Sequence, residues 1–211
     1  MFPQIARDDV FRIETSRLWL RWPTRHDCDA IKSYASYPEV ADMTSTIPHP
    51  YPDGEAERFV ERVREKNSCG ETLELLIVRK SSPQYVIGTV LLRFMQSQKL
   101  VLGYAIHPDH WGQGYATEAA KALIDVAFLL VDVDEIDAII RLENTASRCV
   151  LKNLGFKYIG DGSNFVPLRK AVQLLEEYQL TRMAYHAAFG GALSPLIWED
   201  SCDRVQWAGA V

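Results

Sequence analysis

No run of apolar residues in this 211-residue sequence is long enough to form a membrane-spanning helix. Such a helix needs about 18 to 20 consecutive apolar residues, and charged residues interrupt every apolar run before that length. The first ten residues include Arg7, Asp8 and Asp9 and lack the apolar core of a secretory signal. We therefore expect a cytoplasmic protein that has no membrane partner.

The sequence also has few cysteines and no residue spacing typical of a metal site. The four cysteines are scattered, without the paired spacing of zinc ligands: Cys28, Cys69, Cys149 and Cys202. His107 and His110 have no cysteine or third histidine spaced near them, so we expect no metal. Scattered cysteines are typical of free thiols in a reducing cytoplasm.

Positive charge is in short supply, with 23 Lys and Arg against 28 Asp and Glu, for a net charge of −5. This balance disfavours nonspecific binding to nucleic acid. It is compatible with a cationic amine substrate, although ordinary solubility accounts for it as well.

What is present is enough for one domain with a sizeable core, since 47% of residues are hydrophobic and 24% are charged. We expect that domain to span residues 1–189, followed by a C-terminal extension over 190–211. Gly190 and Gly191 begin the extension, which carries Trp198 and Trp207. Two tryptophans predict packing on the chain's own domain or on a second copy, which would make a homodimer. The alternative is a partly ordered terminus.

Apolar runs and alternation predict most of the strands. Residues 13–21 alternate and are expected to form one strand. Three further strands, joined by short polar links, are expected to form an antiparallel meander: 73–79, 86–94 and 100–106. Residues 136–142 alternate as another strand, and a further strand begins at 156–159. Residues 174–183 fit either a helix or a strand.

Helices are predicted from apolar stripes and capping residues. Thr24 to Asp27 is similar to a capping box and opens a first helix, with Pro38 ending that region. Asp53 caps a second helix, and residues 43–52 between them form a loop. Residues 116–127 repeat apolar side chains at spacings of three and four, and 146–153 form a helix that Gly155 ends.

Trp111-Gly112-Gln113-Gly114-Tyr115-Ala116 lies between the strand at 100–106 and the helix that follows. Glycines let the backbone approach a ligand closely, and the free N–H groups of a first helical turn attract anions. This order therefore predicts a phosphate or pyrophosphate site, although the same pattern also occurs as a plain turn. No Gly-Lys-Ser/Thr follows, and Thr117 stands at the third glycine position of the dinucleotide fingerprint, so both of those motifs are excluded.

Three segments in the same order resemble the GNAT superfamily of N-acetyltransferases, over roughly residues 12–183. Residues 107–119 (H-P-D-H-W-G-Q-G-Y-A-T-E-A) are similar to its acetyl-CoA loop, with Trp111, Gly114 and Ala116 at the positions of the pattern Gln/Arg-x-x-Gly-x-Gly/Ala. Trp111 departs from that pattern but is familiar in the branch of ribosomal-protein N-terminal acetyltransferases. Residues 14–21 (E-T-S-R-L-W-L-R) and 144–156 (N-T-A-S followed by L-G-F) also resemble that branch.

The resemblance implies an α+β GNAT-like fold, with a mixed, mostly antiparallel sheet and helices on both faces, and it favours a strand at 174–183. It implies acetyl-CoA as cosubstrate, with the thioester where strands 100–106 and 136–142 splay apart and backbone N–H groups near Ile106 and His107 polarising its carbonyl. Segments around 43–52 would form one wall of the acceptor site. The implied cofactor-binding residues are Ile106, His107, Trp111, Gly112, Gln113, Gly114, Tyr115, Ala116, Thr117, Asn144 and Ser147.

The usual acid and base of the superfamily do not carry over to this sequence. Val101 stands where many relatives have an acidic residue, and Leu151 stands where many have a tyrosine acid. The resemblance implies Ser147 as the acid, with a helix contact or a bond to the pantetheine as its alternative role. It implies a hydrogen bond from Asn144 to the cofactor. The base is open, with two histidines and two glutamates as candidates: His107, His110, Glu71 and Glu74.

The expected function is therefore acetyl transfer from acetyl-CoA to a primary amine by direct attack. The acceptor is a protein N-terminal α-amine or a small amine. One alternative is a transferase that uses a longer acyl-CoA. Another is a non-catalytic acyl-CoA-binding or regulatory module, which Val101 and Leu151 motivate.

Overall fold

The structure is a computed structural model that describes residues 12–95 and 99–190. The predicted tail, with Trp198 and Trp207, lies outside the described residues apart from Gly190. Part of the predicted link between the second and third meander strands, at 96–98, lies outside them as well.

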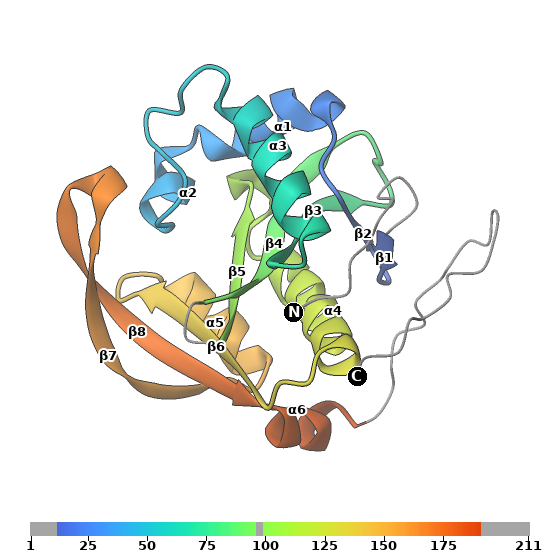
Figure 1. Cartoon of the computed structure of the whole chain (residues 1–211), viewed down its shortest axis with the longest axis vertical. Coiled ribbons are helices and arrows are strands. Elements are labelled where there is room, and N and C mark those ends of the chain that lie inside the picture. Colours follow the sequence, from blue (N-terminus) through green and yellow to red (C-terminus); the bar gives the residue numbers. More distant parts are fainter. Residues whose placement is uncertain (1–11, 96–98, 191–211) are drawn as a thin grey trace.

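The described residues form one eight-stranded sheet in the order β1-β2-β3-β4-β5-β6-β8-β7 (Figure 1). Every neighbouring pair is antiparallel except β5 and β6, which are parallel. This confirms the predicted mixed, mostly antiparallel sheet and its meander. The strands are β1 (Arg12–Glu14), β2 (Leu18–Arg21), β3 (Thr72–Arg79), β4 (Val86–Phe94), β5 (Leu100–Ile106), β6 (Glu135–Arg141), β7 (Lys157–Val166) and β8 (Ala171–Thr181).

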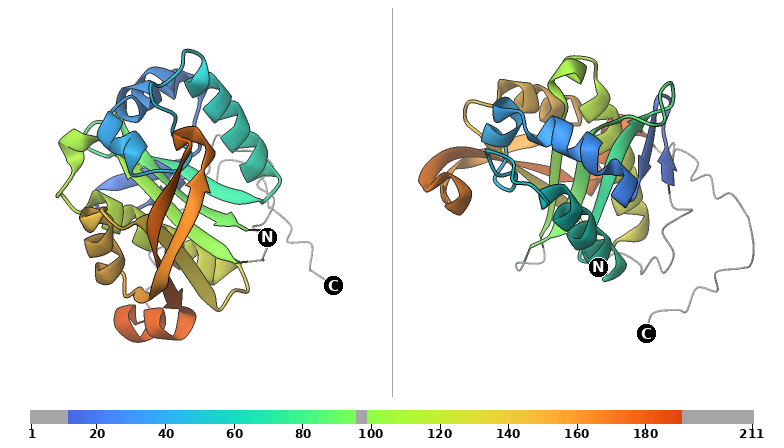
Figure 2. Two further views of the ribbon diagram at one scale, coloured as in Figure 1. Left: turned by 90° about the vertical axis from the view of Figure 1, so that its left-hand side faces the viewer. Right: turned by 90° about the horizontal axis from the view of Figure 1, so that it is seen from above.

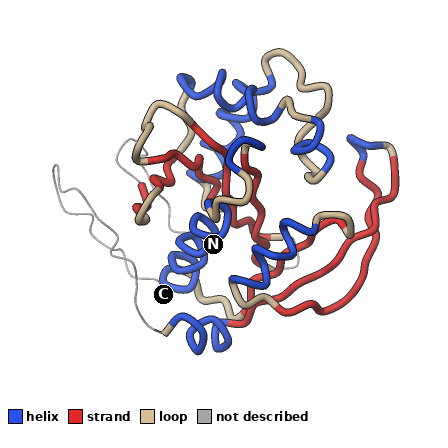
Figure 3. Tube along the Cα trace, turned by 180° about the vertical axis from the view of Figure 1, so that it is seen from behind, coloured by secondary structure: helices blue, strands red, loops and turns tan. Residues whose placement is uncertain are grey.

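Helices lie on both faces of the sheet, as Figure 2 shows in two further views. Those of the described residues are α1 (Cys28–Ala35), α2 (Pro38–Asp42), α3 (Glu55–Ser68), α4 (Tyr115–Leu130), α5 (Thr145–Asn153) and α6 (Arg182–Phe189). Helices α4 and α5 lie on the face turned to the viewer in Figure 3. None of the helices within the described ranges is long and apolar enough to cross a membrane.

The core has two layers because successive side chains of a strand point to opposite faces of the sheet. In β3, Leu75 and Ile77 belong to the cluster that contains Leu123 of α4. Leu76 and Val78 belong to the other cluster, which packs beneath α1 and α3. The uninterrupted apolar run of β3, residues 75–78, is therefore the expected sequence of a strand segment that is covered on both faces.

Three predicted element boundaries are wrong. The single strand expected at 13–21 is a hairpin, because Thr15 N–H donates to the Leu18 carbonyl at 3.0 Å and turns the chain between β1 and β2. Pro38 begins α2 instead of ending a helical region, since proline is tolerated in the first helical turn. The N-cap of α3 is Gly54, at φ 74°, and not Asp53.

The other predicted elements are confirmed to within a few residues, and the segment at 174–183 is resolved. It is strand β8 as far as Thr181, whose hydroxyl accepts a hydrogen bond from Ala184 N–H at 3.2 Å and caps α6. The capping box at Thr24 is present, because the Asp27 carboxylate accepts from the Thr24 N–H at 2.7 Å. It opens a 3-10 turn that leads into α1.

Strands β7 and β8 form a long hairpin that curves toward α2 (Figure 1). At its turn, Arg169 donates from Nη2 to the carbonyls of Ala41 and Ile47, the latter at 2.8 Å. Arg141, at the end of β6, donates to the Asp42 carbonyl at 2.7 Å. These two arginines hold the C-terminal end of α2 and the chain that follows it against the C-terminal half of the sheet.

Candidate functional site

The parallel strands β5 and β6 pair over three residues and then part. Their last pair is Leu102 with Ala138. Beyond it, β5 stays with β4 as far as Ile106, and β6 stays with β8 as far as Arg141. A gap therefore opens within the sheet, at the place where the family resemblance implied a splay.

The amide of Ile106 points into this gap. Ile106 lies opposite Gly88 of β4, and the next residue, His107, donates its N–H to the Ile87 carbonyl at 2.8 Å. In an antiparallel ladder, this bond makes Ile106 and Gly88 a pair whose own amides face away from each other. Two backbone amides were expected at the thioester, those of Ile106 and His107. The His107 amide is already hydrogen-bonded within the sheet, so only the Ile106 amide is directed toward the gap.

The glycine loop follows β5 after a 3-10 turn at Pro108–His110 and ends at the N-terminus of α4. Gly112 and Gly114 have φ of 70° and 77°, in the left-handed region that favours glycine. Gly114 is the N-cap, and the first helical bond runs from the Glu118 N–H to the Gly114 carbonyl. The amides of 115–117 therefore have no partner within the helix. A Cβ added at Gly112 would meet no atom within 4 Å, so the backbone there is open to a ligand.

Two side chains of the loop brace it from within. Trp111 donates from its indole N–H to the Ile106 carbonyl at 2.7 Å. Gln113 donates from its side-chain amide to the Asp109 carbonyl at 3.0 Å. The loop therefore keeps its shape through contacts with the end of β5 and with the turn that follows it.

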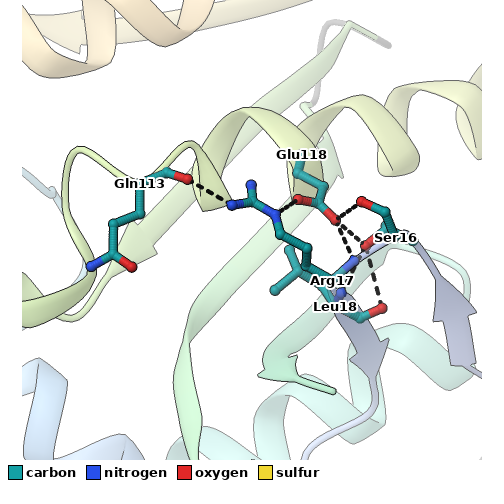
Figure 4. A network of polar contacts seen from close by, with 6 residues as sticks. Ser16, Arg17, Leu18, Gln113 and Glu118 are labelled. Atoms are coloured by element: carbon teal, nitrogen blue, oxygen red, sulfur yellow. Dashed lines mark hydrogen bonds and ion pairs between the residues drawn. The ribbon is translucent and has the colours of Figure 1, made fainter. Parts of the chain in front are cut away.

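Arg17 and Glu118 hold the loop from the side of the β1–β2 turn (Figure 4). Glu118, in the first turn of α4, accepts from the Arg17 N–H at 2.8 Å and from Arg17 Nε at 2.6 Å. It also accepts from the hydroxyls of Thr15 and Ser16, at 2.6 and 3.0 Å. Arg17 Nη1 in turn donates to the Gln113 carbonyl at 3.0 Å.

Burial opposes the ionisation of Glu118, but hydrogen bonds from Thr15, Arg17 and Ser16 outweigh it and hold the pKa of this carboxyl below its usual value. The Arg17 guanidinium also stacks over the Tyr115 ring, 4.5 Å from its centroid. The glycine loop and the helix that it opens are therefore fixed before any ligand arrives.

Ser147 lies at the gap, in the first turn of α5, and is 7% exposed. Its Oγ is 2.6 Å from the Tyr104 hydroxyl. The side chain of Asn144 is the N-cap of α5, because its Oδ1 accepts the Ser147 N–H at 3.0 Å. Leu151, one turn further on, is fully buried in the core. Of the residues that the sequence pointed to here, Ser147 is the one whose side-chain hydroxyl lies beside the gap.

His107 and His110 are engaged in the turn before the loop. The His107 Nδ1 accepts the Asp109 N–H at 3.2 Å, and its ring packs edge-on against Tyr37 at 5.0 Å. Burial, together with the nearby charge of Arg79, lowers the pKa of His110. Within the described residues, no group of three His, Cys, Asp or Glu side chains is placed to hold a metal.

The two glutamates named as base candidates differ in their surroundings. Glu71 is exposed in the turn before β3. Glu74, within β3, points to the face beneath α1 and α3, where burial raises its pKa to about 7 against the opposing charges of Arg62, Arg93 and Lys66. Glu74 therefore holds a proton at neutral pH much more readily than a surface carboxyl does.

Sequence reasoning missed three residues of this region. Arg17 and Glu118 lie within the family motifs, but they are 101 positions apart, and no spacing reveals their contact. Tyr104 lies in an apolar run, where an aromatic residue indicates core packing. The sequence offered two signals of these contacts, the opposite charges of Arg17 and Glu118 and the hydroxyl of Tyr104. Charged residues and hydroxyls occur throughout a sequence of this length, so neither signal identifies these residues.

A strand pair that parts beside a glycine loop at a helix N-terminus, within a mixed sheet, defines an acyl-CoA-dependent acyltransferase fold. The chain belongs to the GNAT acetyltransferase family, because the sequence model of the family described as "Acetyltransferase (GNAT) domain" matches residues 17–157. The chain is 30% identical over 149 residues to the uncharacterized N-acetyltransferase p20 of Bacillus licheniformis, a match that covers 69% of this chain and 82% of that protein. It is thus an acetyl-CoA-dependent acetyltransferase by family.

Solved structures share the fold. A ribosomal-protein-S5-alanine acetyltransferase from Vibrio fischeri aligns with a TM-score of 0.68 and 20% identity, covering 81% of this chain and 96% of that one. The microcin C7 self-immunity acetyltransferase MccE, solved with acetyl-CoA and AMP, aligns with a TM-score of 0.69 and 15% identity, covering 79% and 93%. The arrangement of sheet and helices is therefore shared with these acetyltransferase structures.

Proposed function

We propose that this enzyme transfers the acetyl group of acetyl-CoA to a primary amine by direct attack. The observation that carries the proposal is that the glycine loop follows the end of β5 that borders the gap. A ligand whose pyrophosphate lies against the amides of 112–117 would run along β5 and bring its other end to Ile106 and Ser147. Acetyl-CoA has this form, with the thioester at the far end from the phosphates.

In the proposed reaction the amine nitrogen attacks the carbonyl carbon of the thioester, the C–S bond breaks, and CoA leaves as the thiolate. The amide of Ile106 would polarise the carbonyl oxygen, as a donor of an oxyanion hole does. The attacking amine must be neutral, so its proton is lost before or during attack. No side chain is assigned as base.

We propose Ser147 as the donor to the leaving sulfur, supported by its place beside the gap and by the burial of Leu151. Replacing Ser147 with alanine should lower kcat by about tenfold to a thousandfold and change the KM for acetyl-CoA little. The reason is that the lost contact forms mainly in the transition state. A raised KM at constant kcat would instead show that Ser147 only holds the pantetheine.

The acceptor is proposed to be a protein N-terminal α-amine or a small amine. Mass spectrometry of a peptide with a free N-terminus, after incubation with acetyl-CoA, should show one added acetyl group on the α-nitrogen. The same peptide with a blocked N-terminus is the control, and polyamines and aminoglycosides represent small amines. Longer acyl-CoA donors run in parallel test the alternative donor. Acetylation of serine or cysteine side chains alone would contradict transfer to an amine.

A cytoplasmic location is proposed, supported by the free thiols of the three described cysteines, Cys28, Cys69 and Cys149. A homodimer is the proposed assembly. Exposed apolar side chains on β7, one of the two edge strands of the described sheet, support it, among them Tyr158 and Phe165. Light scattering that gives the mass of one chain at micromolar concentration would contradict the dimer.

A further inference from the structure

Tyr104 and Ser147 form a hydroxyl pair across the elements that border the gap. Tyr104 is on β5, two residues beyond Leu102, where pairing with β6 ends. Ser147 is in the helix that follows β6. The Tyr104 hydroxyl is 2.6 Å from Ser147 Oγ and 3.4 Å from the Ser147 carbonyl oxygen. The shorter distance is that of a good O–H···O hydrogen bond.

The direction of this hydrogen bond follows from the acidity of the two groups. A phenol has a pKa of about 10, and an aliphatic hydroxyl is a far weaker acid, so Tyr104 is the better donor and Ser147 Oγ the acceptor. The Tyr104 ring packs against the core cluster beneath α4, which fixes where its hydroxyl lies. With one of its two lone pairs engaged by Tyr104, Ser147 Oγ still has its own hydrogen to donate to a third group.

Neither hydroxyl is suited to give up its proton completely. Burial raises the pKa of Tyr104 above its usual range, and the hydrogen bond with Ser147 offsets only part of this. A thiol, by comparison, has a pKa of about 8.5 in the ordinary case of cysteine. Complete transfer of a proton from Ser147 or Tyr104 to a thiolate is therefore uphill, whereas a hydrogen bond to the thiolate has no such cost.

We propose that Tyr104 is a positioning residue that orients the Ser147 hydroxyl as a hydrogen-bond donor to the thioester sulfur. The proposal rests on the proposed function, because it requires the sulfur of acetyl-CoA to lie in the gap. When the nitrogen–carbon bond forms and the C–S bond breaks, the electron pair of that bond stays on sulfur. Ser147 stabilises this thiolate and keeps its own proton, and the proton of the amine passes to solvent.

The test is the pKa of the CoA thiol when CoA is bound, measured from the ultraviolet absorbance of the thiolate as pH is varied. This readout needs binding but no turnover. A donor at the sulfur should lower the thiol pKa of bound CoA by about one unit relative to free CoA, since a hydrogen bond to a charged group is the stronger kind. Ser147→Ala and Tyr104→Phe should each remove most of that shift, and Tyr104→Phe should have no further effect in the Ser147→Ala background.

The matched control is Tyr185→Phe, which deletes another buried hydroxyl, bonded to Asp125 at 2.7 Å between α6 and α4. It should leave the thiol pKa of bound CoA unchanged. Thermal melting of Tyr104→Phe shows whether the variant is folded. With an amine acceptor, Tyr104→Phe should lower kcat about tenfold at unchanged KM and introduce no new ionisation into the pH profile.

An unshifted thiol pKa in the wild-type complex would overturn the proposal, as would a shift that Tyr104→Phe leaves intact. Effects of the two substitutions that simply add would also overturn it, because Tyr104 would then not act through Ser147. A lowered thiol pKa that both substitutions abolish, in a protein that acetylates no amine, would support this inference while the proposed function fails. Absence of CoA binding would overturn both.

Discussion

Replacing Glu118 with alanine removes the carboxylate at the centre of the contacts between α4 and the β1–β2 turn. Its four hydrogen bonds come from Thr15, Ser16 and the backbone and side chain of Arg17. The Glu118 side chain is 15% exposed, whereas that of Arg17 is 48% exposed. After the substitution, water can therefore accept hydrogen bonds from the Arg17 guanidinium and from the exposed Ser16 hydroxyl. The hydrogen bonds from Thr15 and from the Arg17 N–H are lost without full replacement.

Two hydrogen bonds to a partly buried carboxylate correspond to roughly 2–4 kcal/mol of unfolding free energy, after discounting the exposed donors. A chain of this size loses about 2–4 °C of Tm per kcal/mol, so Glu118→Ala should melt roughly 5–15 °C lower. The matched control is Glu61→Ala, which breaks the exposed ion pair with Arg25, whose two side chains are 61% and 80% exposed. That pair should contribute less than about 1 kcal/mol.

The effect of Glu118 should depend on pH in a defined direction. The pKa of Glu118 is lowered in the folded protein, so its contribution is fully present above the pKa of the unfolded chain, and is lost as pH falls through the folded pKa. The difference in Tm between wild type and Glu118→Ala should therefore be largest near pH 7 and shrink in acid. Equal Tm values for the Glu118 and Glu61 variants at pH 7 would refute the role given to these contacts.

Two other substitutions probe the loop and the buried carboxyl of β3. Gly114→Val should weaken acetyl-CoA binding more than tenfold by calorimetry, because φ 77° at Gly114 is strained for a residue with a side chain, and that side chain would stand where a pyrophosphate approaches the backbone. Gly160→Val, where an added Cβ meets nothing within 4 Å, should leave the affinity unchanged, and equal affinities of the two variants would contradict this argument. Burial raises the pKa of Glu74 to about 7, so ionisation should cost wild type up to roughly 3 kcal/mol of stability as pH rises from 5 to 8. Glu74→Gln should lack this loss, and parallel curves of Tm against pH would contradict the burial of the charge.

Much of the sheet could be predicted from the sequence because apolar runs and short polar links determine a meander with little help from distant contacts. Strand β7 shows where that reasoning ends. Its central residues, Gly160, Asp161, Gly162 and Ser163, have low strand propensity, and they are extended because they pair with β8. Pairing with a distant segment overrides local preference, and no local pattern reports it.

The glycine loop could be predicted because its residue types are required by its shape, and the positive φ of Gly112 and Gly114 confirms that reason. The contacts that fix the loop and Ser147 could not. They join Arg17 to Glu118, and Tyr104 to Ser147, across 101 and 43 residues of sequence. Helix α6 was not predicted for a different reason. The apolar alternation of β8 continues up to Thr181, the residue that caps α6, so the sequence pattern shows no break where the strand ends and the helix begins.

Release of CoA from acetyl-CoA, followed with a thiol reagent in the presence and absence of an amine, tests the central assignment most directly. We expect release that rises with the concentration of a peptide N-terminus, polyamine or aminoglycoside, saturates, and yields the acetylated amine in equal amount. Gly114→Val should reduce release at a fixed, subsaturating concentration of acetyl-CoA. Tight binding of acetyl-CoA without release above the buffer rate, for every amine of the panel, would show a binding module and contradict the assignment as an N-acetyltransferase.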